Sequence, residues 1–228
     1  MAVRDFGQKV DVCRRIKEVL KNYEEGSLLK EMVQNADDAG ASVFDVLLDL
    51  RTHGSSELAL PGTAAFQGPA LVTHNDAVFA DSDLESIQQI GGSQKAGSRS
   101  TKTGRFGVGF CSCYHATDLP SFLSRDFLVV LDPHCAHVSD NRSEPGKMLC
   151  FLENPKTVAS SRDTFEPYRV FGCSLQHSYP GTIFRLPLRT AEQAAASRIS
   201  AQPFVGAPAR GLLDAFLELL PELPLFLT

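Results

Sequence analysis

The chain has 228 residues, 43% of them apolar, and its 22 basic and 27 acidic side chains give a formal net charge of −5. This length suggests one domain with enough apolar material for a sizeable core, and the acidic balance argues against broad nucleic-acid binding. The N-terminus lacks the apolar run of a signal peptide, and no apolar run approaches the roughly 18 residues that span a bilayer, so we expect no membrane partner. The six cysteines lack a disulfide-framework spacing. We therefore expect reduced thiols in a cytoplasmic protein.

Helical and extended patterns alternate along the chain. Ser27 is the predicted N-cap of the second helix, and Ser82 with Glu85 forms a predicted capping box at the start of the third. Residues 51–67 are expected to form a loop, and residues 190–211 a short helix or linker. In chain order the pattern predicts a helix over 8–23, a helix that stops at Gly40, a buried strand over 42–50, a strand over 68–73, a helix over 81–90, strands over 126–131, 148–152 and 182–188, and a helix over 212–220.

The second predicted helix carries an unusual polar face. At 100° per residue, Glu31, Asn35 and Asp38 fall within an arc of roughly 60°. A carboxylate, an amide and a second carboxylate in one line can activate a water molecule and hold a metal ion. The alternative is an amphipathic surface helix whose polar face is only solvated.

A glycine-rich segment follows the third predicted helix. Residues 91–105 contain four basic side chains and no acidic one, and they lead into Gly104-Arg-Phe-Gly-Val-Gly-Phe110 and a helical Cys-Ser-Cys-Tyr-His-Ala. Glycines at a helix N-terminus, with free N–H groups, favour phosphate; the alternative is a solvated loop. The segment is not a Walker A motif, because Thr101 stands where the glycine before Lys102 is required. It is not a dinucleotide fingerprint either, because a loop precedes the glycines and Ser112 occupies the third glycine position.

The order of these features resembles the Bergerat (GHKL) ATP-binding fold of gyrase B, the 90-kilodalton heat-shock chaperones, histidine kinases and the MutL ATPases. In detail it resembles the heat-shock-chaperone-like modules of sacsin. The resemblance spans residues 6–189, in several independent blocks. These are Phe6-Gly-Gln8, Gln34-Asn-Ala-Asp-Asp-Ala-Gly40, Gln67-Gly-Pro-Ala-Leu71, Asn75-Asp-Ala-Val-Phe79, Gly109-Phe-Cys-Ser-Cys-Tyr-His115, Leu131-Asp-Pro-His134 and Gly181-Thr-Ile-Phe-Arg-Leu-Pro-Leu-Arg189.

The resemblance implies an α/β (α+β) two-layer sandwich, with a mixed, mostly antiparallel sheet and helices on one face. This domain would cover residues 1–189, with residues 190–228 forming a linker and a helix packed on it and continuing into a longer protein. The implied ligands are ATP and magnesium. Glu31 would be the catalytic base, Asn35 the magnesium ligand, and Asp38 would line the nucleotide site. The remaining implied nucleotide-binding residues are Asn75 or Asp76 and Thr182 for adenine, and Gly104, Gly107, Val108, Gly109 and Phe110 for phosphate, with residues 91–103 as a lid.

One block departs from the superfamily pattern. Its ATP-binding members have Asp-x-Gly-x-Gly where this chain has Asn75-Asp-Ala-Val-Phe79, so Asn75 takes the place of the adenine-binding aspartate unless the strand shifts by one residue to use Asp76. A lost buried hydrogen bond costs about 1–3 kcal/mol, roughly 10- to 100-fold in affinity. The side chains that replace the glycines also fill space near the base.

Three functions are compatible with these residues. The first is an ATP-binding, slowly hydrolysing module of a sacsin-type chaperone; the second is a non-catalytic structural or client-binding module that retains the fold without nucleotide. The third, an ATPase of another superfamily branch, is disfavoured by the sacsin-like blocks and the acidic charge. The expected partners are a nucleotide, and client proteins or other modules of a larger chain.

Overall fold

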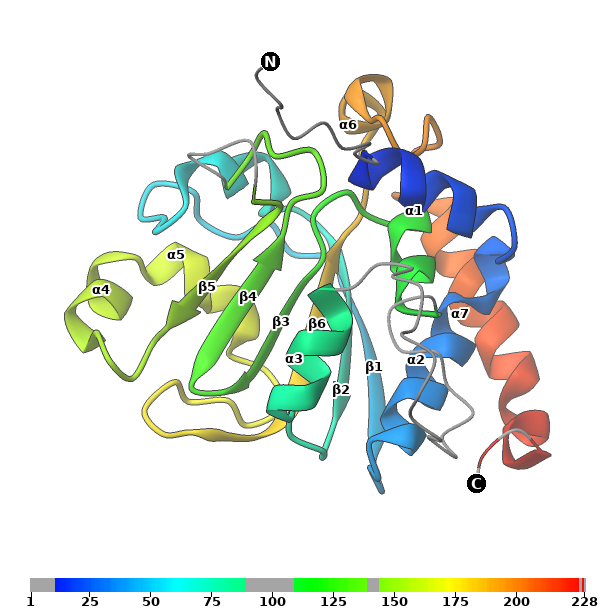
Figure 1. The fold of residues 1–228 in the computed structure, drawn as a ribbon, viewed down its shortest axis with the longest axis horizontal. Coiled ribbons are helices and arrows are strands. Elements are labelled where there is room, and N and C mark those ends of the chain that lie inside the picture. The colour runs from blue at the N-terminus through cyan, green and yellow to red at the C-terminus, as the bar shows by residue number, and fades with distance from the viewer. Residues whose placement is uncertain (1–10, 89–108, 139–143, 226, 228) are drawn as a thin grey trace, which may run out of the picture.

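The computed structural model describes residues 11–88, 109–138, 144–225 and 227, and its centre is one six-stranded sheet (Figure 1). The strand order is β1-β2-β6-β3-β4-β5, and every paired neighbour is antiparallel. The strands are β1 (Phe44–Asp49), β2 (Ala70–Asn75), β3 (Ser121–Arg125), β4 (Phe127–Leu131), β5 (Gly146–Cys150) and β6 (Tyr179–Pro187). The sequence predicted a mixed, mostly antiparallel sheet, whereas the described pairs are antiparallel throughout.

Seven α-helices and five 3₁₀ segments are found in the described part of the chain. The α-helices are α1 (Val12–Leu20), α2 (Leu28–Asp38), α3 (Asp81–Gln88), α4 (Pro155–Ser160), α5 (Arg162–Phe165), α6 (Ala191–Ala196) and α7 (Ala207–Leu219). The 3₁₀ segments are η1 (Glu25–Ser27), η2 (Pro61–Phe66), η3 (Gly109–His115), η4 (Glu166–Tyr168) and η5 (Leu220–Leu225). None of the helices described is both long and apolar enough to cross a bilayer.

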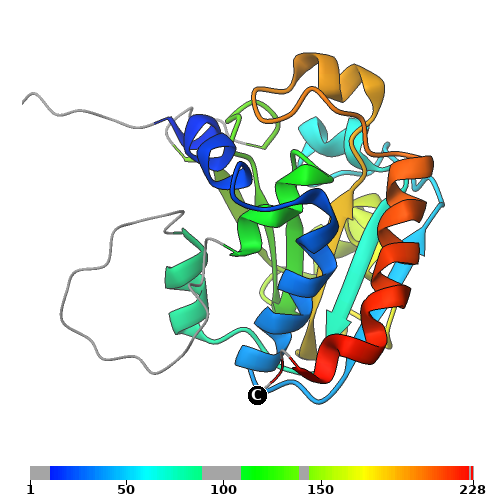
Figure 2. The ribbon, with the colours of Figure 1, turned by 90° about the vertical axis from the view of Figure 1, so that its right-hand side faces the viewer.

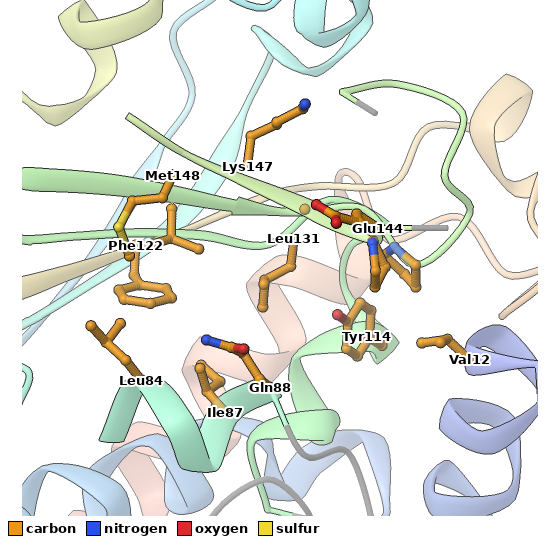
Figure 3. A pocket seen from close by; sticks show the side chains of 14 residues that line it. Val12, Leu84, Ile87, Gln88, Tyr114, Phe122, Leu131, Glu144, Lys147 and Met148 are labelled. Atoms are coloured by element: carbon orange, nitrogen blue, oxygen red, sulfur yellow. The ribbon is translucent and has the colours of Figure 1, made fainter. Parts of the chain in front are cut away.

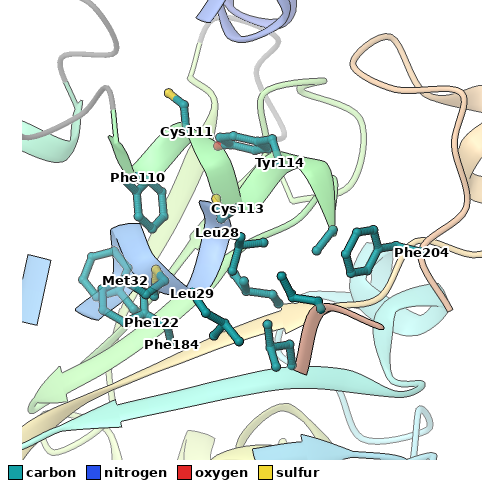
Figure 4. Close-up of a cluster of buried hydrophobic side chains, with 14 of the residues drawn as sticks. Leu28, Leu29, Met32, Phe110, Cys111, Cys113, Tyr114, Phe122, Phe184 and Phe204 are labelled. Carbon is teal, nitrogen blue, oxygen red and sulfur yellow. The ribbon is translucent and has the colours of Figure 1, made fainter. Parts of the chain in front are cut away.

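The longer helices cover one face of the sheet and enclose the main core with it. Figure 2 shows α2 and α7 side by side on this face, and the buried side chains of α1, α2, η3 and α7 join those of the strands in one cluster. In Figure 4, Leu28, Leu29 and Met32 of α2 lie among aromatic rings that include Phe110, Phe122 and Phe184. The opposite face carries a second cluster, closed by short segments that include η2, α5 and η4. The structure is therefore an α+β open-sheet sandwich, as the resemblance implied, but helical segments lie on both faces and not on one alone.

Strand alternation decides which side chains meet α2. In β6, Thr182 and Phe184 face the helices, whereas Ile183 and Arg185 face the second cluster. Antiparallel pairing sets Asn75 of β2 opposite Thr182. Two polar residues 107 positions apart thereby reach the same face of the sheet, directly beneath α2.

The C-terminal part of the chain is attached through a buried arginine. The guanidinium of Arg189, after β6, donates to Asp118 Oδ1 at 2.8 Å and 3.1 Å, and also to the carbonyl oxygens of Tyr114, His115, Thr117 and Gln202. Only 1% of Arg189 is exposed. A reciprocal capping box of Thr190 and Gln193 starts α6 immediately afterwards.

Of the two predicted helix caps, Ser27 holds the N-cap position of α2 without the expected side-chain bond, and the capping box at α3 is wrong. Ser27 already has helical dihedral angles because η1 precedes α2, and its hydroxyl donates to the Glu24 carbonyl at 2.8 Å rather than capping α2. At α3, Asp83 accepts the Ala80 N–H at 2.9 Å, so the capping carboxylate is not that of Glu85. The predicted end of α2 is confirmed: Gly40 follows the helix with φ +79°, a conformation that glycine adopts without strain.

One strand is less buried than predicted, and one strand and two short helices were not predicted. β1 lies at the edge of the sheet and is mostly half-buried, although its apolar composition predicted a buried strand. β3 was not predicted, nor were the short helices α4 and α5. β3 is only five residues long and contains two serines and an arginine, so its local pattern is weak even though it is central in the sheet.

Candidate functional site

Helix α2 places Asn35 over a small cavity between the helix, β2, β6 and α3. The cavity has a volume of about 40 Å³. Four residues predicted from the sequence, namely Asn35, Asn75, Phe110 and Thr182, line it together. The other lining residues are Met32, Ala36, Ala39, Ala77, Val78, Phe79, Asp83, Ile87 and Phe184.

Glu31 lies one helical turn before Asn35 and contacts the start of η3. A Cβ atom at Gly109 would collide with Glu31 Oε2, so only glycine allows the carboxylate to lie this close to the backbone. Burial raises the pKa of the Glu31 carboxyl, and the nearby Lys30 opposes that effect. Within the described residues its oxygens have no hydrogen-bond partner. This is a position from which a carboxylate can accept a proton or orient a water molecule.

Asn75 and Asp76 point to different places. Asn75 is buried in the cavity wall, and its Oδ1 accepts the Ala77 N–H at 3.1 Å. Asp76 accepts the N–H groups of Ser42 and Val43 at 2.8 Å and 3.0 Å, and also the Ser42 hydroxyl. These bonds, that of the Ser42 hydroxyl above all, lower the pKa of Asp76 to about 2. Its carboxylate is thus engaged at the entry to β1 and does not line the cavity.

Phe79 and Val78 reduce the space beside Asn75. The Phe79 ring stacks on Phe122, with centroids 4.4 Å apart, and meets Phe184 edge-on at 6.1 Å. Its backbone N–H donates to Ser124 Oγ at 3.0 Å, which fixes the loop that carries the ring. Pockets for small organic ligands measure about 300–1,000 Å³, whereas about 40 Å³ holds one or two water molecules. As the structure stands, adenine does not fit here.

The other predicted site residues lie apart from the cavity or outside the described residues. Asp38 is the half-buried last residue of α2 and is not part of the cavity wall. Gly104, Gly107, Val108 and the predicted lid at 91–103 fall outside the described residues. Among those described, no three His, Cys, Asp or Glu side chains gather as a metal site. A cation beside Asn35 would therefore need phosphate oxygens and water as its other ligands.

Sequence reasoning missed Ser124, whose hydroxyl lies beside that of the predicted Thr182 below the cavity. Ser124 Oγ donates to the Gly181 carbonyl at 2.8 Å and lies 3.2 Å from Thr182 Oγ1, which donates to the Ala77 carbonyl at 2.8 Å. Ser124 belongs to β3, whose sequence gave no strand signal. Phe184 was also missed, although the period of two along β6 places it on the same face as Thr182.

Fold and site together define a class: an open antiparallel α+β sandwich in which one helix holds an amide over a small cavity on the sheet and an acid one turn before it. Residues 9–228 match the family model described as the sacsin domain, so the chain belongs to the sacsin domain family. It is 38% identical to human sacsin in an alignment 229 positions long that covers 95% of this chain and 5% of sacsin. The chain therefore spans a small fraction of the length of that relative.

Proposed function

We propose that this chain is a non-catalytic module of a sacsin-type chaperone, which keeps a Bergerat (GHKL) fold as a structural or client-binding unit. The observation that carries the proposal is the small volume, about 40 Å³, of the cavity beneath α2, where the ATP-binding relatives of the fold would seat adenine. Phe79 stands where those relatives have glycine, and its ring is held by Phe122. Opening the space would require the ring to leave its aromatic neighbours.

The polar contact for adenine is also altered. A carboxylate in place of Asn75 would accept the hydrogen bond of an adenine amino group; here the carboxamide oxygen already accepts the Ala77 N–H. Asp76 is not available in its place, because it holds the backbone of Ser42 and Val43. All six cysteines are free thiols, which suits a module of a cytoplasmic chain.

A second candidate is Mg-ATP binding with slow hydrolysis. It is favoured by Glu31, whose carboxylate lies against Gly109 with a raised pKa, and by Asn35 one turn further along the same helix face. In this candidate Glu31 would orient the attacking water, Asn35 would hold magnesium, and Asp38 would line the same site. The phosphate contacts would come from the glycine-rich segment before Phe110.

Calorimetric titration with Mg-ATP separates the two candidates. For the non-catalytic module we expect no saturable heat at millimolar nucleotide, and the same trace for Asn35→Ala. Saturable binding by the unaltered chain that Asn35→Ala abolishes would refute the proposal and support the second candidate. Suppression of the aggregation of an unfolded protein, measured with and without Mg-ATP, would then show whether client binding depends on nucleotide; we expect no dependence.

Restoring the superfamily residues tests whether the Phe79 ring is what excludes adenine. Asn75→Asp alone should not bring binding, since the Phe79 ring still fills the space beside it. Combined with Ala77→Gly and Phe79→Gly it should produce measurable Mg-ATP binding, provided circular dichroism shows an unchanged fold. A single variant that binds as well as the triple variant would mean that the missing carboxylate, and not the Phe79 ring, prevents adenine from binding.

A further inference from the structure

A second and much larger cavity lies between α3 and the β3-β4-β5 end of the sheet (Figure 3). Its volume is about 450 Å³. Leu84 and Ile87 of α3 form one wall, and Phe122, Leu131 and Met148 of the sheet face them. An apolar cavity of about 150 Å³ is already enough to bind benzene, and ligand pockets begin near about 300 Å³. The space is therefore large enough for an organic molecule of more than one ring.

One buried polar group reaches this apolar space. Tyr114 of η3 is only 1% exposed, and it lines the cavity. Figure 3 shows the phenol oxygen on the side of the ring that faces Leu131 and Gln88. Burial raises the pKa of Tyr114 well above its usual value, so the hydroxyl keeps its proton and can donate. An acceptor on a bound ligand would take a hydrogen bond from this buried donor.

The charges at the cavity favour a neutral ligand. Glu144 and Lys147, which carry opposite charges, both line it, and the carboxylate of Asp132 acts electrostatically on Tyr114. A ligand carboxylate or phosphate bound at Tyr114 would be repelled by Asp132, whereas a carbonyl oxygen would not. The cavity is also distinct from the one beneath α2: the two share Ile87, but Asn35 and Thr182 belong only to the smaller one.

We propose that this cavity is a binding site for a neutral, largely apolar organic molecule, with an aromatic or branched aliphatic body and one carbonyl-type acceptor for the Tyr114 hydroxyl. The apolar walls supply most of the affinity, and the phenol fixes the orientation of the ligand.

Methyl-detected NMR with two matched probes tests the proposal on the 228-residue chain. Acetophenone carries a carbonyl oxygen, and ethylbenzene has nearly the same shape without an acceptor. Both should shift the methyl signals of Ile87 and Met148, with acetophenone binding on the order of 1 mM. Tyr114→Phe should weaken acetophenone about three- to tenfold and leave ethylbenzene unchanged.

Two tryptophan variants locate the site. Leu84→Trp fills the cavity from a half-buried position on α3 and should abolish the shifts caused by both probes. Leu217→Trp makes the same substitution at an exposed position of α7, outside the cavity, and should leave binding intact. Absence of shifts at Ile87 and Met148 well above millimolar probe would overturn the proposal, as would binding that Leu84→Trp does not reduce. Equal weakening of both probes by Tyr114→Phe would overturn the role of the hydroxyl. None of these results bears on nucleotide binding beneath α2.

Discussion

Replacing Arg189 with methionine should be among the most destabilising single changes in this chain. Methionine fills much of the same volume but removes every donor of the guanidinium. Among the described residues, the Asp118 carboxylate, itself buried, would keep only the Ser197 hydroxyl as a side-chain donor. The carbonyl oxygens of Tyr114 and Thr117 would lose the N–H groups that now lie 2.7 Å and 3.0 Å away.

The size of the effect follows from burial. Removing one partner of a buried ion pair costs about 3–5 kcal/mol, because the other charge is left unpaired in a poorly solvated place. Domains of this kind are stable by about 5–15 kcal/mol, so Arg189→Met should remove a large share of the total. The change also releases the Gln202 carbonyl, so residues 197–204 should lose protection against hydrogen exchange first.

Urea unfolding followed by circular dichroism measures the loss. Arg162→Met is the matched control, because its guanidinium pairs with Glu57 at 3.2 Å on the surface and should cost less than about 1 kcal/mol. Adding Asp118→Asn to Arg189→Met should recover part of the loss by removing the unpaired charge. A loss for Arg189→Met no larger than that for Arg162→Met would refute the reasoning.

Two further predictions concern protonation and thiols. Burial acts to raise the pKa of Asp49, but hydrogen bonds from Arg51 and His53 outweigh it and lower the pKa to about 2. The stabilisation that Asp49 provides is therefore complete above the unfolded pKa of about 3.9 and is lost as the pH falls towards 2. In Asp49→Asn the melting temperature should fall less steeply across that pH window than in the unaltered chain. An unchanged slope would contradict this prediction. With a thiol reagent under native conditions, the half-buried Cys135 and Cys150 should react before the other four cysteines, which are buried, and a single common rate would contradict this order.

The sequence predicted the parts of the site that depend on local periodicity. Glu31 and Asn35 lie one turn apart on α2 as the 3.6-residue repeat requires, and the strands that carry Asn75 and Thr182 coincide with apolar runs. This chain has alanine and phenylalanine at positions 77 and 79, where the superfamily pattern has glycine, which indicated a filled space beside Asn75. The structure places the Phe79 ring there.

Long-range pairings could not be read from the sequence. Nothing near Asp76 indicates that its carboxylate binds the backbone of Ser42 and Val43, more than thirty residues earlier. Ser124 joins the site only because β3 pairs with β6, and the short β3 has no recognisable pattern of its own. Such contacts depend on the strand order of the sheet, which local propensity does not determine.

A crystal structure with magnesium and a non-hydrolysable ATP analogue tests the central claim most directly. The account predicts that the Phe79 ring stays stacked on Phe122 and that no adenine ring lies between Asn75 and Phe184. An adenine ring in that space, with Phe79 displaced and magnesium at Asn35, would contradict it.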